Sequence, residues 1–332
     1  DNLIKNKTNE INNKVKLEFN KTRIHLKPNE FNLVVRLQEP KILVKDNEID
    51  LSKLDLFLSI KSFFSSDFLL KRAEIAFKKN DVKDLTKITN IFLPRIINKR
   101  LEKIFAEGNL EGEFIVPFEL DGSIGEDYGF SGKVSDASIN LTKKFSIKNL
   151  TTEINHVRED ENNRFILMIK EGSLFDLEVG GSTINLLREK NETKVKTLLH
   201  TNGKIGFSEI KTISSLFSLN TNFFEDINGS GNLKTSINFD ISNKFKIKNL
   251  SYSTEGDISS LELQTKEKRI IRKYLPLYDP RIILKDANIK FTKLKSKQVA
   301  DLNGLIKLSD QYDSFKIRNK YDADKKNFDI KG

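Results

Sequence analysis

Many short segments of this chain alternate strictly between apolar and polar residues, and this feature constrains the fold most. In "KVKLEFN" (14–20), Val15, Leu17 and Phe19 alternate with lysine and glutamate. Successive side chains of a β-strand point to opposite faces, so this period of two predicts strands with one apolar face and one solvent-exposed face. The sequence therefore predicts a mostly β, antiparallel fold.

The breaks between these segments predict how the strands are connected. Pairs of a polar residue and glycine recur at Asp121-Gly122, Glu171-Gly172, Asn202-Gly203, Asn228-Gly229, Glu255-Gly256 and Asn303-Gly304. Such pairs favour tight turns, and we expect a meander of hairpins joined at these positions. Pro117 interrupts one alternating segment and predicts either a β-bulge or an edge position there.

Three stretches change to helical spacing. The longest is 82–107, where Val82, Leu85, Ile88 and Phe92 follow a period near 3.6 after a candidate N-cap at Asp81. Shorter helices are predicted near 208–218 and 265–275. We therefore divide the chain into an amino-terminal β-module (1–80), a helical segment (81–107) and a continuing β-region (108–332).

A short motif occurs twice, one hundred residues apart. "KKFSIKNLTTE" begins at Lys143 and "NKFKIKNLSYS" begins at Asn243. In each copy two apolar residues share a phase and the following leucine breaks it, which predicts a β-bulge that redirects the strand. Looser versions occur at 67–75, 281–289 and 314–320, and chance similarity in a chain rich in Ile, Lys and Asn is the alternative.

Composition excludes several classes of chemistry. The chain has no cysteine, which removes disulfides and thiolate chemistry, and its three histidines are widely separated. We find no nucleotide-binding, metalloprotease, serine-hydrolase or calcium-loop motif. We expect no enzymatic activity, no metal and no cofactor. The net charge is +10 without a dense basic block, so we expect a solvated surface and no nucleic-acid binding.

Two long stretches resemble a known family. "LDLFLSIKSFFSSDFLLKRAEIAFKKNDVKDLTKI" (54–88) resembles the amino-terminal module of AsmA-like proteins. "IFAEGNLEGEFIVPFELDGSIGEDYGFSGKVSDASINLTKKFSIKNLTTEIN" (104–155) resembles the domain that these proteins share with their YhdP and TamB relatives, with its "G-x-v-x-d-a-x-i" and "i-x-n-l" patterns. The general sequence pattern resembles the family over roughly residues 40–332, and the resemblance is most specific between 104 and 155. The chain lacks the residues that distinguish one subfamily from another.

The resemblance implies a fold, a location and a function. The fold would be a long twisted antiparallel β-sheet curled into an apolar groove. The protein would lie in the periplasm of a Gram-negative bacterium, anchored to the inner membrane through a segment outside this chain, which we expect to be a fragment. It would carry phospholipid between the inner and outer membranes as a segment of a bridge-like lipid-transfer protein. The alternative is a structural or assembly factor of the cell envelope, important for outer-membrane biogenesis, with envelope proteins as partners.

Elementary physics is compatible with the implied groove. A sheet with one apolar face must pair with a second sheet, close into a barrel, or curl into a trough in which acyl chains complete the burial, at about 0.8 kcal/mol per CH₂ group. We expect the lining to consist of the apolar residues of the alternating and repeated segments: Val15, Leu17, Phe19, Phe114, Val116, Phe118, Leu120, Phe145, Ile147, Phe165, Leu167, Ile169, Leu177, Val179, Ile237, Phe239, Ile241, Phe245, Ile247, Ile289 and Phe291.

Overall fold

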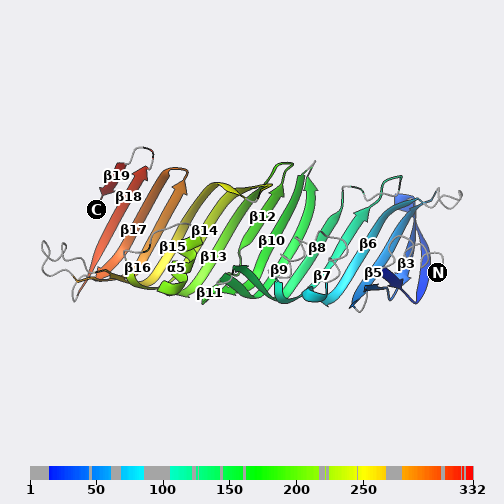
Figure 1. Ribbon diagram of the computed structural model, residues 1–332, viewed down its shortest axis with the longest axis horizontal. Coiled ribbons are helices and arrows are strands. Elements are labelled where there is room, and N and C mark those ends of the chain that lie inside the picture. Colours follow the sequence, from blue (N-terminus) through cyan, green and yellow to red (C-terminus); the bar gives the residue numbers. More distant parts are fainter. Residues whose placement is uncertain are drawn as a thin grey trace. The chain divides into compact units, whose positions relative to one another are not determined.

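The computed structural model consists of two compact units, which we describe separately. Unit 1 comprises Asp1–Leu141 and Lys148–Leu167, and unit 2 comprises Thr142–Ile147 and Met168–Gly332. Both are built of antiparallel strands, so the prediction of a mostly β fold is confirmed (Figure 1). The described residues are 15–44, 47–60, 69–85, 105–121, 125, 127–142, 145–159, 162–216, 221, 224–244, 246–266, 279–307, 311–322, 324 and 327–331. The predicted division at 80/81 and 107/108 stays a prediction.

In unit 1 the strands form a meander, and the first strands also form a second layer. Its elements are β1 (Val15–Glu18), β2 (Lys21–Lys27), the 3₁₀ helix η1 (Pro28–Glu30), β3 (Asn32–Gln38), β4 (Lys41–Val44), β5 (Asn47–Ser59), β6 (Leu70–Asp81), β7 (Phe105–Pro117), β8 (Gly129–Thr142), β9 (Phe145–Glu159) and β10 (Asn162–Leu174), which continues into unit 2. The first part of β5 pairs with β4, which also pairs with β1, and the second part of β5 pairs with β3. β5 therefore belongs to two layers.

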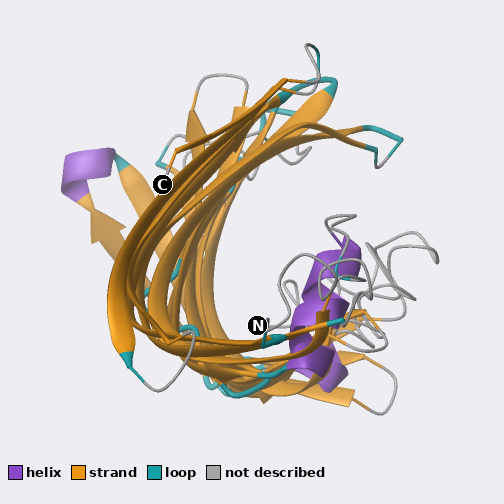
Figure 2. Cartoon of the chain, turned by 90° about the vertical axis from the view of Figure 1, so that its left-hand side faces the viewer, coloured by secondary structure: helices purple, strands orange, loops and turns teal. Residues whose placement is uncertain are grey.

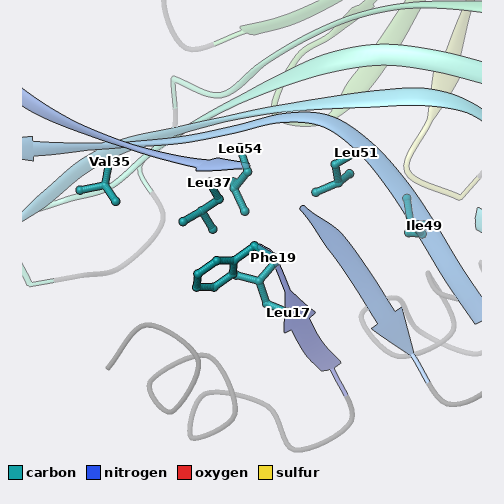
Figure 3. Close-up of a cluster of buried hydrophobic side chains, with 7 residues drawn as sticks. All are labelled: Leu17, Phe19, Val35, Leu37, Ile49, Leu51 and Leu54. Carbon is teal, nitrogen blue, oxygen red and sulfur yellow. The ribbon is translucent and has the colours of Figure 1, made fainter. Parts of the chain in front are cut away.

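A closed hydrophobic core lies where these two layers meet. Leu17 of β1 and Phe19, which follows that strand, pack against Val35, Leu37, Ile49, Leu51 and Leu54 of β3 and β5 (Figure 3). Leu51 is 1% exposed and Leu37 2% exposed. Leu85, which follows the end of β6, packs against the same cluster. This end of unit 1 thus buries its apolar side chains against its own protein.

The other face of the unit 1 sheet carries a ladder of ion pairs. Arg36 donates to both carboxylate oxygens of Asp55, at 2.8 and 2.6 Å, and the Asp55 side chain is only 2% exposed. This hydrogen bonding raises the pKa of Arg36. Lys53 reaches Glu74 at 2.6 Å, and Arg72 lies 3.9 Å from the centre of the Phe57 ring. Charged side chains therefore gather on this outer face, which also buries Val34 and Phe57, 1% and 3% exposed, while the closed core lies on the inner face.

Unit 2 contains longer strands in simple sequential order. After the end of β10 come β11 (Leu177–Glu178), β12 (Thr183–Arg188), β13 (Glu192–Ile205), the helix α5 (Phe207–Leu216), β14 (Phe224–Ser242), β15 (Ile247–Thr265), β16 (Arg281–Leu294), β17 (Lys297–Lys307), β18 (Tyr312–Asp322) and β19 (Asn327–Lys331). From β12 onward each strand pairs antiparallel with the next. The described strands of unit 2 thus form one meander.

A row of mostly small residues, interrupted by Ile258, crosses the middle of the unit 2 sheet. Gly203 pairs with Gly231, Gly231 with Ile258, and Ile258 with Ala287. A Cβ added to Gly304 would lie 2.5 Å from the Cα of Ala287. Bulges interrupt the pairing beside Gly231 and Ala287, and the long strands are bent along their length (Figure 2). Small residues and bulges together allow a sheet to curve.

The turns predicted at several glycines were wrong, because these glycines serve the curvature of the sheet. Gly172, Gly203, Gly229, Gly256 and Gly304 all lie inside strands. Gly203, Gly256 and Gly304 have φ angles of 140°, 153° and 156° and approach the backbone of a neighbouring strand closely. Glycine is used in these strands for close approach and bending, a role that resembles a turn signal in the sequence. Pro117 is the last residue of β7.

The repeated motif lies at the start of a strand in both copies. Asn149 of β9 and Asn249 of β15 each have a φ angle of 52°, in the left-handed region that asparagine tolerates. In the second copy Asp240 pairs with Lys248 and Asn238 with Ser251, so two residues of β15 face one residue of β14. The predicted bulge is confirmed there. In the stretch 314–320, β18 pairs with β17 in unbroken register, so that looser version contains no bulge.

A second bulge motif is shared by both units. Asp136 and Asp286 have φ angles of 54° and 47°, and the alanine that follows each is buried. Each Asp-Ala pair faces a glycine of the neighbouring strand, Gly108 in unit 1 and Gly304 in unit 2. The same device thus bends β8 and β16.

The helical predictions have mixed outcomes. Residues 82–85 are helical after Asp81, and Val82 is buried. Residues 86–104 lie outside the described part of the chain, and the predicted end at 107 was too late because Phe105 pairs with Ile139 as the first residue of β7. α5 confirms the helix predicted near 208–218. Of the stretch 265–275, Thr265 ends β15 and residues 267–275 lie outside the description.

Replacing Gly304 with alanine is expected to destabilise unit 2 by about 2 kcal/mol, because the new Cβ would lie 2.5 Å from the backbone of Ala287. The matched control is Gly181→Ala, where φ is 79° and no atom lies within 4 Å of the new Cβ. That change is expected to cost only about 1 kcal/mol of backbone strain. Urea unfolding of both variants measures the difference, and equal costs would contradict the close-packed bend.

Candidate functional site

One face of the unit 2 sheet carries most of its apolar side chains. Strand register places Phe239 beside Val195, Ile237 beside Tyr252, and Phe291 beside Ala300. The apolar side chains that share this face, called here the apolar face of unit 2, are Val195, Leu199, Ile205, Ile227, Leu233, Ile237, Phe239, Ile241, Tyr252, Ile258, Leu261, Leu263, Ile282, Leu284, Ile289, Phe291, Leu302 and Ile306. It extends across β13 to β17.

Most side chains of this face are only half-buried. Val195, Ile227 and Leu284 are 5%, 5% and 4% exposed, but Ile237, Phe239, Ile289 and Phe291 stay partly accessible. The described strands of unit 2 belong to one sheet, their main contacts are with neighbouring strands, and α5 contacts β14. The face therefore differs from the closed core of unit 1, where a second layer covers the equivalent side chains.

A hollow of about 190 Å³ opens on this face at β16 to β18. It is lined by Phe291, Gln298, Ala300, Asn319 and Tyr321. Among the described residues, the buried Oδ1 of Asn319 has no hydrogen-bond partner. Pockets that hold an entire drug-sized ligand measure about 300–1,000 Å³, so this hollow suits a segment of a chain-like ligand.

The opposite face of the same strands is polar and carries cross-strand ion pairs. Arg318 donates to Asp301 at 2.6 Å, which lowers the pKa of Asp301 and raises that of Arg318. Arg281 and Glu262 form a similar pair at 2.6 Å. Both pairs are exposed to solvent and contribute little stability. Their charged groups keep this face of the sheet hydrated.

In unit 1 a row of aromatic rings continues the inner face beyond the closed core. Phe114 lies between Phe77 at 5.8 Å and Phe130 at 4.5 Å, measured between ring centroids. A second group stacks His156 between Tyr128 at 4.8 Å and Phe165 at 4.5 Å. The Nε2 atom of His156 lies 3.0 Å from the Oδ1 of Asn163. Phe114, Phe130 and Phe165 are half-buried.

The predicted lining residues fall into distinct environments. Half-buried are Phe114, Val116, Phe118, Ile147, Phe165, Leu167, Ile237, Phe239, Ile241, Ile289 and Phe291. Leu17 and Phe19 belong to the closed core, and Ile169, Leu177 and Val179 are also buried. Leu120 and Ile247 are 85% and 63% exposed. The side chains of Val15, Phe145 and Phe245 lie outside the description.

Sequence reasoning missed the members of the face that come from mixed segments. Val195 and Leu199 alternate with lysine and histidine, but the neighbouring Leu198 obscures the pattern. Tyr252 and Thr254 follow the bulge at Asn249, which shifts their phase. The asparagine that permits the bulge is the sequence signal that could have assigned them.

Comparisons with known proteins do not assign this geometry to a family. No protein-family model matches the chain, and neither a curated protein nor a solved structure matches it. Among the described residues, no group of three or more acidic or histidine side chains is arranged to hold a metal ion. The described helices are too short or too polar for any of them to cross a membrane. The apolar face is therefore the feature on which a function must be argued.

Proposed function

We propose that this protein shields the acyl chains of phospholipids on its apolar faces, as a segment of a bridge-like lipid-transfer protein between the inner and outer membranes of a Gram-negative bacterium. The observation that carries the proposal is the half-buried state of Ile237, Phe239, Ile289 and Phe291 on a sheet face that no described strand covers. Each CH₂ group of a lipid that such side chains bury contributes about 0.8 kcal/mol.

The dimensions of the apolar face support this proposal. The strands from β13 to β17 are successive neighbours, and adjacent strands lie about 4.8 Å apart, which gives roughly 19 Å across the apolar face. One leaflet of a bilayer contributes half of a hydrocarbon core of about 30 Å. The face of unit 2 is therefore long enough to cover an acyl chain, while the headgroup stays in water.

The amphipathic character of the sheet supports the same conclusion. The polar face with its ion pairs tolerates water, whereas bare apolar side chains on the other face would be costly to leave exposed. The resemblance to AsmA-like proteins points in the same direction. A periplasmic location, membrane anchoring and envelope partners follow from that resemblance and belong to the proposal.

Native mass spectrometry of the protein, purified from a bacterial host without detergent, tests the proposal. We expect adducts with the masses of phospholipids, which disappear after organic extraction. A protein that is free of lipid and monodisperse would contradict it. In that case the apolar face would be assigned to protein contacts, as in the structural or assembly alternative.

A further inference from the structure

The β14–β15 and β16–β17 turns lie on one long edge of unit 2 (Figure 1). We define residues 240–248 and 293–297, at these two turns, as the hairpin edge. It contains six lysines and one aspartate, a formal charge of +6 − 1 = +5. Five of the lysines are exposed, namely Lys244, Lys246, Lys248, Lys295 and Lys297.

Among the described residues, Lys244, Lys246, Lys295 and Lys297 form neither a salt bridge nor a side-chain hydrogen bond, in contrast to the ion-paired lysines and arginines elsewhere. The carboxylates nearest this edge are Asp240, opposite Lys248, Asp322, opposite Lys297, and Asp324, which accepts a hydrogen bond from Ser296 at 2.6 Å. Asp240 accepts a hydrogen bond from Asn249 at 2.6 Å. The sixth lysine, Lys293, lies 5.7 Å from the centre of the Tyr252 ring. Positive charge is thus in excess along this edge.

The same edge exposes two large aliphatic side chains. Ile247 is 63% exposed and stands between Lys246 and Lys248, and Leu294 is 59% exposed and stands between Lys293 and Lys295. They are the most exposed large hydrophobic residues among those described in unit 2. Two aliphatic side chains that project from hairpins, each flanked by lysines, suit the boundary between lipid headgroups and acyl chains.

We propose that the hairpin edge docks on the surface of an anionic lipid bilayer. Lysines near an anionic leaflet attract its headgroups, while Ile247 and Leu294 enter the interfacial region. Ile247 pairs with Ile241, so the apolar face of unit 2 reaches this edge. The inference concerns the outside of the sheet and does not require that lipid occupies the apolar face.

Flotation with vesicles tests the electrostatic part. The full chain is expected to bind vesicles of phosphatidylcholine mixed with phosphatidylglycerol and not vesicles of phosphatidylcholine alone. Binding should weaken steeply when salt rises from about 0.1 M to about 1 M, as the Debye length falls from about 10 Å to about 3 Å. The variant Lys246→Gln/Lys248→Gln/Lys295→Gln should lose affinity on the order of 100-fold, about fivefold for each lysine.

The matched control removes equal charge from the polar face. Lys196, Lys234 and Lys285 are exposed there, and the variant Lys196→Gln/Lys234→Gln/Lys285→Gln should retain most of the binding. Equal losses in the two triple variants would overturn the proposal, because net charge alone would then account for binding. Far-ultraviolet circular dichroism confirms that both variants keep their β-structure.

Two further measurements test the apolar part. The chain has no tryptophan, so Leu294→Trp provides a single fluorophore, whose emission should shift to the blue on anionic vesicles, whereas Thr292→Trp should not shift. Ile247→Ser/Leu294→Ser should weaken vesicle binding about tenfold or more. If this variant binds vesicles normally and heparin competes fully, the edge is a general polyanion surface and the membrane proposal is overturned. Co-purified phospholipid is measured separately, so failure of either proposal is recognised independently.

Discussion

Replacing Leu51 with aspartate is expected to unfold unit 1, whereas the same replacement at Phe239 leaves unit 2 folded. Leu51 is 1% exposed within the closed core, so a carboxylate there would lose packing and be buried without a partner. The cost should be about 5 kcal/mol or more, comparable to the whole stability of a domain. Phe239 is half-buried, and a carboxylate at its position can reach water.

Circular dichroism and urea unfolding distinguish the two variants. The Leu51→Asp protein should lose part of its β-signal or its first unfolding transition, and Phe239→Asp should keep both. Unfolding of unit 2 by Phe239→Asp would show that its apolar face is an ordinary closed core, and lipid binding there would have to be abandoned.

The second large effect concerns lipid content. The double variant Phe239→Asp/Phe291→Asp should reduce co-purified phospholipid at least about tenfold, because two charges then interrupt the surface on which each buried CH₂ group contributes about 0.8 kcal/mol. Phe239 lies on β14 and Phe291 on β16, so both substitutions alter the central part of the apolar face. Extraction and quantification of lipid per mole of protein measure the effect.

The matched control adds the same two charges to the opposite face of the same strands. Ser236 pairs with Ser253, which pairs with Thr292, so the double variant Ser236→Asp/Thr292→Asp places both carboxylates on the polar side. It should retain the lipid content of the unaltered protein. Equal loss of lipid in both variants would attribute the effect to charge or stability and would contradict a lipid site on one face.

Alternation in the sequence was sufficient to predict several of the strands and which of their side chains share a face. Phe114 and Val116, or Ile237 and Phe239, share a face as expected because strand geometry fixes that relation locally. The bulge at Asn249 was also predictable, since the shift in phase is visible in the sequence.

Alternation could not predict which faces are covered. Leu17 and Phe239 stand in equally regular segments, yet Leu17 is 8% exposed in a two-layer core and Phe239 is half-buried on an open sheet. The difference arises because β5 pairs with both β4 and β3, a tertiary arrangement that a single segment does not encode. The roles of Gly108 and Gly304 were missed for a similar reason, since each depends on an Asp-Ala bulge in the neighbouring strand.

Site-specific photo-crosslinking in the host cell tests the central claim most directly. A photoreactive residue at Phe239 or Phe291 faces the proposed lipid, and one at Asp240 or Lys290, next in sequence on the same strands, faces away. We predict that the first two positions capture phospholipid, detected by mass spectrometry of the crosslinked protein, and that the other two do not. Capture of protein alone at Phe239 and Phe291, or equal capture of lipid at all four positions, would contradict a lipid-binding apolar face.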